Sequence, residues 1–351
     1  MEKTGWGQLG IVLALSRIFS EAANFPSHDI HYGMQRFTVI IASYLLLSVT
    51  LLPVFTAVKQ GRSDIYSGTA GKSAAAVLII YLTAASVITT TRLQFYASST
   101  IFDVAPPWLL ILFVSIVCLY GLFKGISAVT RTGVIVAAIF LLLLIIVIIG
   151  VSKNITLHYL YPAITDNTAS FFREVMSEFS KNAEIAIFAA LFPTIRKGAV
   201  KSLYLCLPLS AGVMLLMTFL YNTVLGEYLN TVNFPFYMLS SLSDISVLQR
   251  LDGIDVTVWI MSAVIKISLI IIAVYNLSLN IFRKKKAAYI TAAASLAVSS
   301  LSSYFFSTNT DDFLDFAGIM ETGLPLVLAT VPLVTASVLI KPKGIIRDEK
   351  A

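Results

Sequence analysis

Charged side chains inside long apolar stretches are the residues of this chain best able to do chemistry. Arg17 and Glu21 lie four positions apart in the first apolar run. At that spacing the two side chains share one face of a helix and could neutralise each other. One charged side chain at the centre of a membrane helix costs about 2.5–3.5 kcal/mol, and such residues commonly mark ligand or ion paths. The alternative is an ion pair that only stabilises a helical bundle.

The residues around this pair are small, polar or helix-ending. Ser20, Ala22 and Asn24 cover the backbone thinly, and Pro26 would end the helix. A stretch of this kind is typical of a discontinuous membrane helix that faces a ligand.

Three further charges lie inside predicted membrane spans. Arg92 either snorkels to the interface or faces the bundle and binds a carboxylate. Glu184 could pair with Arg17 or Arg92, or take up a proton. Lys266 lies near mid-membrane and must find an anion, which could be Glu21, Glu184 or a ligand carboxylate. Its ammonium could also replace the sodium ion of cation-coupled transporters.

The arrangements typical of enzymes are missing from the sequence. The three histidines lie in or beside predicted outer loops, and no nucleophile elbow, phosphate loop or metal-spaced cluster is present. Cys118 and Cys206 both lie in apolar runs, where they are expected to pack as small hydrophobes. We therefore expect neither an enzyme nor a metal or cofactor site.

Composition indicates an integral membrane protein. The chain is 57% hydrophobic and 13% charged, whereas soluble domains carry about 25% charged residues. A bilayer core needs about 20 apolar residues per helix, and windows of that size predict ten spans. The predicted spans are approximately 6–25, 37–58, 73–99, 107–123, 133–151, 167–193, 202–225, 254–281, 287–307 and 319–340.

The distribution of basic residues predicts the orientation. Most lysines and arginines fall in segments on the same side as the N-terminus, so the positive-inside rule places both termini in the cytoplasm. This basic excess faces the anionic inner leaflet, and no nucleic-acid partner is needed to explain it. Arg36 is assigned to an outer loop. Glu321 belongs to an outer acidic group, which is either solvated or a docking surface.

Ten spans in a single membrane domain, 1–351, divide into five plus five. Repeat one covers about 6–151 and repeat two about 167–340, and an odd number of spans inverts the second copy. The first span ends in Asn24-Phe25-Pro26 and the sixth in Leu191-Phe192-Pro193. This pattern fits an all-α inverted repeat with broken helices 1 and 6 and substrate near the midplane. The alternative is that two mostly apolar segments share these short motifs by chance.

One run of the sequence resembles a known family. Residues 243–255, continuing through Trp259-Ile260 and 266–269, resemble the endospore germination permeases. These are the B-subunits of nutrient germinant receptors, within the amino acid–polyamine–organocation superfamily. The stretches 125–131 and 160–162 agree with this resemblance.

The resemblance implies a LeuT-like fold of ten helices in the spore inner membrane. It implies a small germinant, usually an amino acid, bound between the broken first and sixth spans and spans 3 and 8. It also implies assembly with a membrane A-subunit and a lipoprotein C-subunit. Lys266 falls on a ligand-lining position of the family, and the small-residue kink of span 1 falls near Phe19-Ser20-Glu21. This chain departs there, with a bulky Phe19 and an acidic Glu21.

The predicted function is therefore a membrane subunit that binds a small germinant and triggers germination. The alternative is a proton-coupled amino acid permease in which Glu21 or Glu184 carries the proton, and a third, weaker reading is a pore-lining subunit of an ion channel. The candidate ligand-binding residues are Arg17, Phe19, Ser20, Glu21, Ala22, Arg92, Glu184 and Lys266.

Overall fold

The structure is a computed structural model that describes residues 4–22, 34–59, 66, 68–100, 106–160, 168–195, 198–243 and 252–330. These residues are almost entirely helical and contain no β-strand. A single parallel bridge joins Thr4 to Ile195.

Five helices make up the first part of the described chain, followed by two short 3-10 turns. They are α1 (Trp6–Ala22), α2 (Met34–Lys59), α3 (Gly68–Thr100), α4 (Pro107–Lys124), α5 (Ile126–Val151), η1 (Ser152–Asn154) and η2 (Leu157–Leu160). Pro107 begins α4, where its missing N–H costs nothing. Gly125, at φ 81°, makes the turn into α5.

The second part contains shorter and more interrupted helices. They are α6 (Thr168–Ser180), α7 (Glu184–Leu191), η3 (Phe192–Thr194), α8 (Ala199–Leu220), the π-helical η4 (Tyr221–Leu225), η5 (Gly226–Thr231), α9 (Pro235–Leu242), α10 (Asp252–Phe282), α11 (Lys285–Thr308) and α12 (Thr310–Glu321).

The chain is a multi-pass membrane protein. Six of the described helices are long and apolar enough to cross a bilayer, and a seventh span results if α12 and residues 324–330, bent by 50°, are counted together. The six are Met34–Leu52, Gly68–Thr100, Ile126–Asn154, Ala199–Leu229, Gly253–Phe282 and Lys285–Thr308. The arrangement of ten spans in two inverted repeats stays a prediction.

The two helices that were expected to be broken differ. α1 runs without interruption through Phe19, Ser20 and Glu21 to Ala22, so the break expected near Phe19–Glu21 is not there. The predicted end of that helix at Asn24–Pro26 lies outside the described residues. The sixth predicted span is interrupted, because α6 ends at Ser180 and α7 begins at Glu184.

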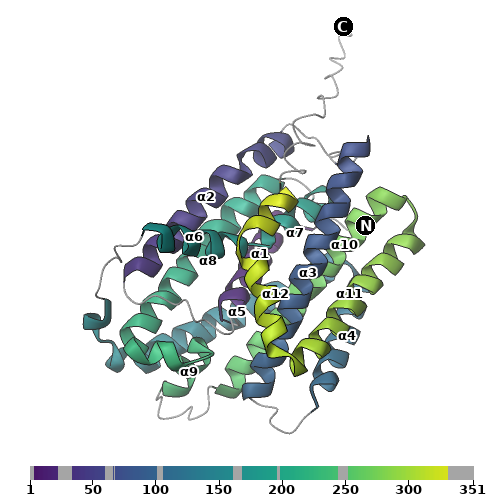
Figure 1. Cartoon of the computed structure of the whole chain (residues 1–351). Coiled ribbons are helices and arrows are strands. Elements are labelled where there is room, and N and C mark those ends of the chain that lie inside the picture. Colours follow the sequence, from purple (N-terminus) through teal and green to yellow (C-terminus); the bar gives the residue numbers. More distant parts are fainter. Residues whose placement is uncertain are drawn as a thin grey trace.

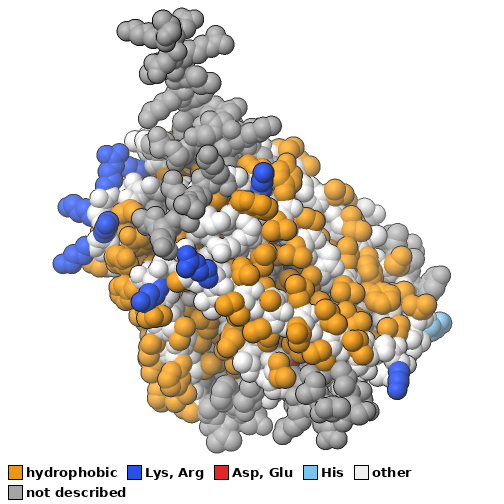
Figure 2. Space-filling view, turned by 180° about the vertical axis from the view of Figure 1, so that it is seen from behind, with side chains coloured by type: hydrophobic (Ala, Val, Ile, Leu, Met, Phe, Trp, Pro, Cys, Tyr) orange, Lys and Arg blue, Asp and Glu red, His pale blue; other side chains and the backbone are white. Residues whose placement is uncertain are grey.

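The core of the molecule lies around α1, α7 and α10. α10 packs against α3, α11, α5, α4 and α1, while α1 also packs against α8 and α7 (Figure 1). Trp259 of α10 is buried against Phe140 and Phe236, with ring centroids 5.3 and 5.4 Å away. Hydrophobic side chains cover most of the face shown in Figure 2, as expected of a surface in contact with lipid. Within this core the side chains of Arg17, Glu184 and Lys266 are buried.

Candidate functional site

Lys266 and Glu184 form a buried ion pair at the interruption between α6 and α7. Lys266 Nζ lies 2.9 Å from Glu184 Oε1, and it also donates hydrogen bonds to Ser20 Oγ and, at 3.3 Å, to Ser16 O. Ser16 Oγ donates to the same Glu184 oxygen at 2.7 Å. Among the anions that could serve Lys266, the structure selects Glu184. The pair joins α10, α7 and α1.

Lys266 contacts one of the two carboxylate oxygens of Glu184, Oε1. Both side chains of the pair are about 95% buried. Glu184 Oε2 has no hydrogen-bond partner among the described residues. A buried charge with incomplete hydrogen bonding is costly, so the pair depends strongly on each member.

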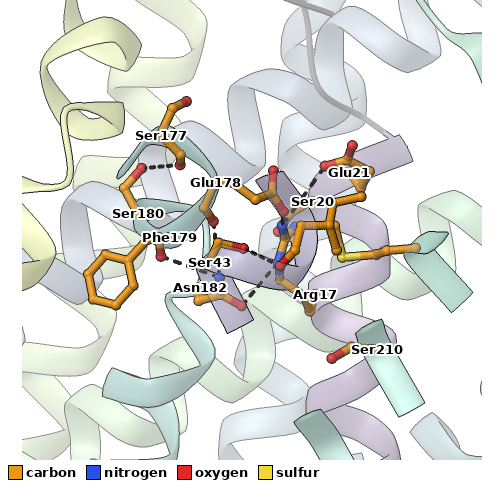
Figure 3. Close-up of polar contacts among 12 residues, drawn as sticks. Arg17, Ser20, Glu21, Ser43, Ser177, Glu178, Phe179, Ser180, Asn182 and Ser210 are labelled. Carbon is orange, nitrogen blue, oxygen red and sulfur yellow. Dashed lines mark hydrogen bonds and ion pairs between the residues drawn. The ribbon is translucent and has the colours of Figure 1, made fainter. Parts of the chain in front are cut away.

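Four charges meet where α1, α2 and α6 come together, and we call Arg17, Glu21, Arg36 and Glu178 the four-charge cluster (Figure 3 shows Arg17, Glu21 and Glu178). Arg17 makes a short ion pair with Glu178, and its contact with Glu21 is longer, at 3.9 Å. Arg36 Nη2 donates to Glu21 Oε1 at 2.6 Å and to Glu178 Oε2 at 2.8 Å. Two positive and two negative charges therefore balance.

This cluster corrects one expectation from the sequence, the position of Arg36, and adds a closer partner for Arg17 than the expected Glu21. Arg36 was assigned to an outer loop, but it lies buried in α2 between two carboxylates. The closest carboxylate to Arg17 is that of Glu178, on another helix, and not that of Glu21. Helical spacing identified a neighbour of Arg17, but Glu178 of α6, a helix that packs against α2, is closer.

Asn182 connects the cluster to the end of α6. Its side-chain amide donates to Glu178 O at 3.0 Å and Phe179 O at 3.3 Å, which satisfies carbonyls at the helix end. Its Oδ1 accepts from Arg17 Nε at 3.1 Å (Figure 3). Asn182 thus ends α6 and ties that end to α1.

A cavity of about 50 Å³ lies beside the interruption, and we call it the site cavity. Its walls come from α1, α3, α10, the α6–α7 segment and the end of α12. The lining residues are Phe19, Ser20, Tyr81, Ala85, Ile88, Thr89, Arg92, Ser180, Lys181, Ala183, Lys266, Met320 and Glu321.

The cavity brings together half of the candidate residues. Phe19, Ser20, Arg92 and Lys266 line it. The others lie nearby without lining it. Arg17 and Glu21 belong to the four-charge cluster, Glu184 pairs with Lys266, and Ala22 is buried at the end of α1.

Arg92 faces the bundle and makes a short ion pair with Glu321. Glu321, which the sequence placed in an outer acidic group, pairs with Arg92 and lines one wall of the cavity. Ser180 Oγ donates to Glu321 O at 3.1 Å and holds α12 against α6. Arg92 Nε has no hydrogen-bond partner among the described residues, so this guanidinium retains a free donor at the cavity.

The size and charge of the cavity limit what it can hold. One buried water molecule needs a cavity of about 10–15 Å³, so this cavity accommodates a few waters or a very small solute. Drug-sized ligands occupy about 300–1,000 Å³. Arg92 and Glu321 both line the cavity and pair with each other, so a larger solute would have to separate them.

Sequence reasoning missed Tyr81, Thr89 and Lys181 as lining residues. Tyr81 gives no signal, because a tyrosine in an apolar helix is most often part of a core. The Thr89 hydroxyl donates to Ala85 O at 2.7 Å within its own helix. Lys181 was detectable, since it is a charged residue within the sixth predicted span, 167–193.

A family model described as "Spore germination protein" matches residues 68–311, well over half of the chain. The chain belongs to this family. The family match begins at α3 and includes Arg92, Glu178, Glu184 and Lys266. α1 and most of α12 lie outside the matched range. No curated protein matches the chain.

Membership of the spore germination family and the apolar helices together assign the chain to the membrane proteins of germination. The resemblance seen in residues 243–269 is confirmed at the level of the family.

Proposed function

We propose that the chain is the membrane subunit of a nutrient-germinant receptor and binds a small zwitterion, such as an amino acid, in the site cavity. The observation that carries this proposal is the Arg92–Glu321 ion pair in the wall of a buried cavity at an interrupted helix. Interrupted membrane helices that line a cavity are common binding sites for small charged solutes.

A zwitterion matches the charges of the cavity. Arg92 and Lys181 can hold a carboxylate, and a guanidinium does so with two parallel hydrogen bonds. Glu321 can hold an ammonium group. A ligand that carries both charges would replace one internal ion pair with two pairs to itself, so no charge would be left buried alone. Phe19, Tyr81 and Ile88 would surround its side chain.

Binding could reach partner subunits through α6 and α1. The cavity wall at Ser180 and Lys181 is continuous with Asn182, which holds Arg17. A ligand that prefers one arrangement of these helices shifts the population toward it. In this proposal the partners are a membrane A-subunit and a lipoprotein C-subunit, the location is the spore inner membrane with both termini cytoplasmic, and no catalysis is involved.

The alternative function is a proton-coupled amino acid permease. In this alternative Glu21 or Glu184 carries the proton, and Glu184 Oε2 has no hydrogen-bond partner among the described residues. A receptor binds its ligand without moving it, so accumulation of a labelled amino acid by vesicles containing the purified protein alone would favour the permease.

The binding proposal is tested by thermal unfolding of the purified protein against a panel of amino acids. A ligand at 100 times its Kd stabilises the folded state by about 2.7 kcal/mol, which is a rise of several degrees in Tm. At least one zwitterion in the panel should produce such a rise, and its decarboxylated analogue should not.

Ala85→Leu is expected to remove the ligand-dependent rise in Tm, because Ala85 lines the cavity and the added carbons would occupy it. Ala84→Leu is the matched control, since Ala84 precedes it on α3 but does not line the cavity. Unchanged ligand stabilisation of the Ala85→Leu protein would contradict binding at this cavity.

A further inference from the structure

A second cavity, of about 300 Å³, lies over α1 between α5 and α8, and we call it the apolar groove. Every side chain that lines it is apolar. α1 contributes Leu15 and Ile18, α5 contributes Ala138 and Leu141, and α8 contributes Leu205, among others. The groove is separate from the site cavity and shares no lining residue with it.

Two close helix contacts lie at one end of the groove, and from them we infer that this end is closed. A Cβ on Gly10 would lie 2.7 Å from Ser202 O, and a Cβ on Gly133 would lie 2.6 Å from Val12 Cγ2. At this level α8 and α5 therefore touch α1 directly. Beyond it the groove follows α1 from Ile11 to Ile18, a length of about 10 Å at the helical rise. That is about two thirds of one leaflet of a ~30 Å hydrocarbon core.

The side of α5 next to the groove meets lipid. Ile135, Ile139 and Leu142 are 62%, 42% and 60% exposed, and Leu141 in the groove wall is 42% exposed. The span that contains α5 is strongly apolar. The medium at the mouth of the groove is therefore hydrocarbon.

Two cations lie just beyond the closed end. Arg131 precedes Val134 of the groove by three residues, and Lys201 precedes Leu205 by four, so each shares a helix face with a lining residue. Both are exposed. Lys201 Nζ lies 5.9 Å from the ring centre of Trp6. The positive-inside rule assigns this end to the inner leaflet.

We propose that the apolar groove binds one acyl chain of an anionic phospholipid of the inner leaflet, with the phosphate beside Arg131 and Lys201. The glycine contacts close the groove, so the headgroup must lie outside it, where the two cations are. Basic side chains near the membrane surface attract anionic lipid headgroups. A lipid that is held through both its acyl chain and its anionic headgroup binds more tightly than a lipid held through its acyl chain alone.

The position of the lipid gives it influence over the site cavity. Leu15 and Ile18 line the groove on one face of α1, while Ser16 and Ser20 on another face hold Glu184 and Lys266. The bound chain would press α1 against the buried ion pair. This inference does not depend on which solute the site cavity binds.

The test counts lipid retained by the full chain. The protein is purified from bilayers that contain equal amounts of phosphatidylglycerol and phosphatidylcholine, and the retained lipid is measured by native mass spectrometry. The wild type should retain one phosphatidylglycerol. Ala138→Phe, which puts a ring into the groove, should lower that retention about tenfold. Ala294→Phe, the same change on the exposed surface of α11, should leave it unchanged.

Lys201→Gln provides a second test that does not disturb packing. It should reduce the preference for phosphatidylglycerol over phosphatidylcholine, whereas Lys285→Gln at the start of α11 should not. Equal retention of both lipids by the wild type would overturn the proposal. It would also be overturned if Ala138→Phe kept its lipid but lost a co-purifying protein, because the groove would then be a subunit interface.

Discussion

Lys266→Ala is expected to destabilise the protein by about 3–5 kcal/mol and to abolish its ligand response, because it leaves Glu184 buried without a cation. Glu184 accepts from Lys266 Nζ at 2.9 Å and is 4% exposed. The change also removes a cation from the cavity wall. Membrane insertion should persist, since the substitution makes α10 more apolar. Thermal unfolding and a ligand dose–response on the same preparation measure the two effects.

The double variant Lys266→Met with Glu184→Gln separates the two effects. It removes both charges at nearly constant volume, so it should regain most of the lost stability. It should not regain the ligand response if the ammonium contributes to binding. A dose–response that is unchanged in Lys266→Ala would exclude Lys266 from the ligand site. Equal stability of the single and double variants would show that the ion pair is absent.

Arg17→Ala is expected to cost about 3–5 kcal/mol, because it leaves two carboxylates facing a single arginine in a buried cluster. Charge reversal identifies the true partner of Arg17. Arg17→Glu combined with Glu178→Arg should yield more folded protein than Arg17→Glu combined with Glu21→Arg. The reason is geometric, since Glu178 contacts Arg17 closely whereas Glu21 lies 3.9 Å away. Yield and Tm after purification measure both.

Lys285→Ala is the matched control for loss of a cation, because Lys285 is exposed at the start of α11. It should change the free energy of unfolding by no more than about 0.5 kcal/mol, as surface substitutions usually do, and Tm should therefore change little. If the pair of reversals at Arg17 and Glu21 gave the better recovery, the sequence-based pairing would be correct and the cluster geometry wrong.

The membrane class and the positions of the helices follow from the sequence. Each predicted span overlaps a helix of the structure, because a run of about 20 apolar residues has no other stable form in lipid. Residues 243–269 were sufficient to suggest the family that the family match then confirmed. The number of true crossings and the inverted repeat remain predictions, since six or seven helices meet the criteria of length and hydropathy.

The exact bounds were less predictable. The fifth span was expected to begin at 133, but α5 begins at Ile126, directly after the Gly125 turn. α1 continues through the segment where a break was expected. The break was expected because this segment has small and polar residues. In the structure, however, the hydroxyls of Ser16 and Ser20 form hydrogen bonds with Glu184, with Lys266 and within their own helix. These hydrogen bonds hold that face of α1 in place, and the helix continues through the segment.

The sequence by itself determined which residues are costly to bury, namely Arg17, Glu21, Arg92, Glu184 and Lys266, because charge in an apolar run is visible in one dimension. Only the tertiary structure decided their partners. Arg17 pairs with Glu178, and Glu21 pairs with Arg36. Arg92 pairs with Glu321, which lies more than 200 residues away in the sequence. An ion pair depends on which helices cross and which of their faces meet, and apolar windows carry no information on either. The site cavity exists because those crossings bring α1, α3, α10 and α12 to one interruption of the sixth span.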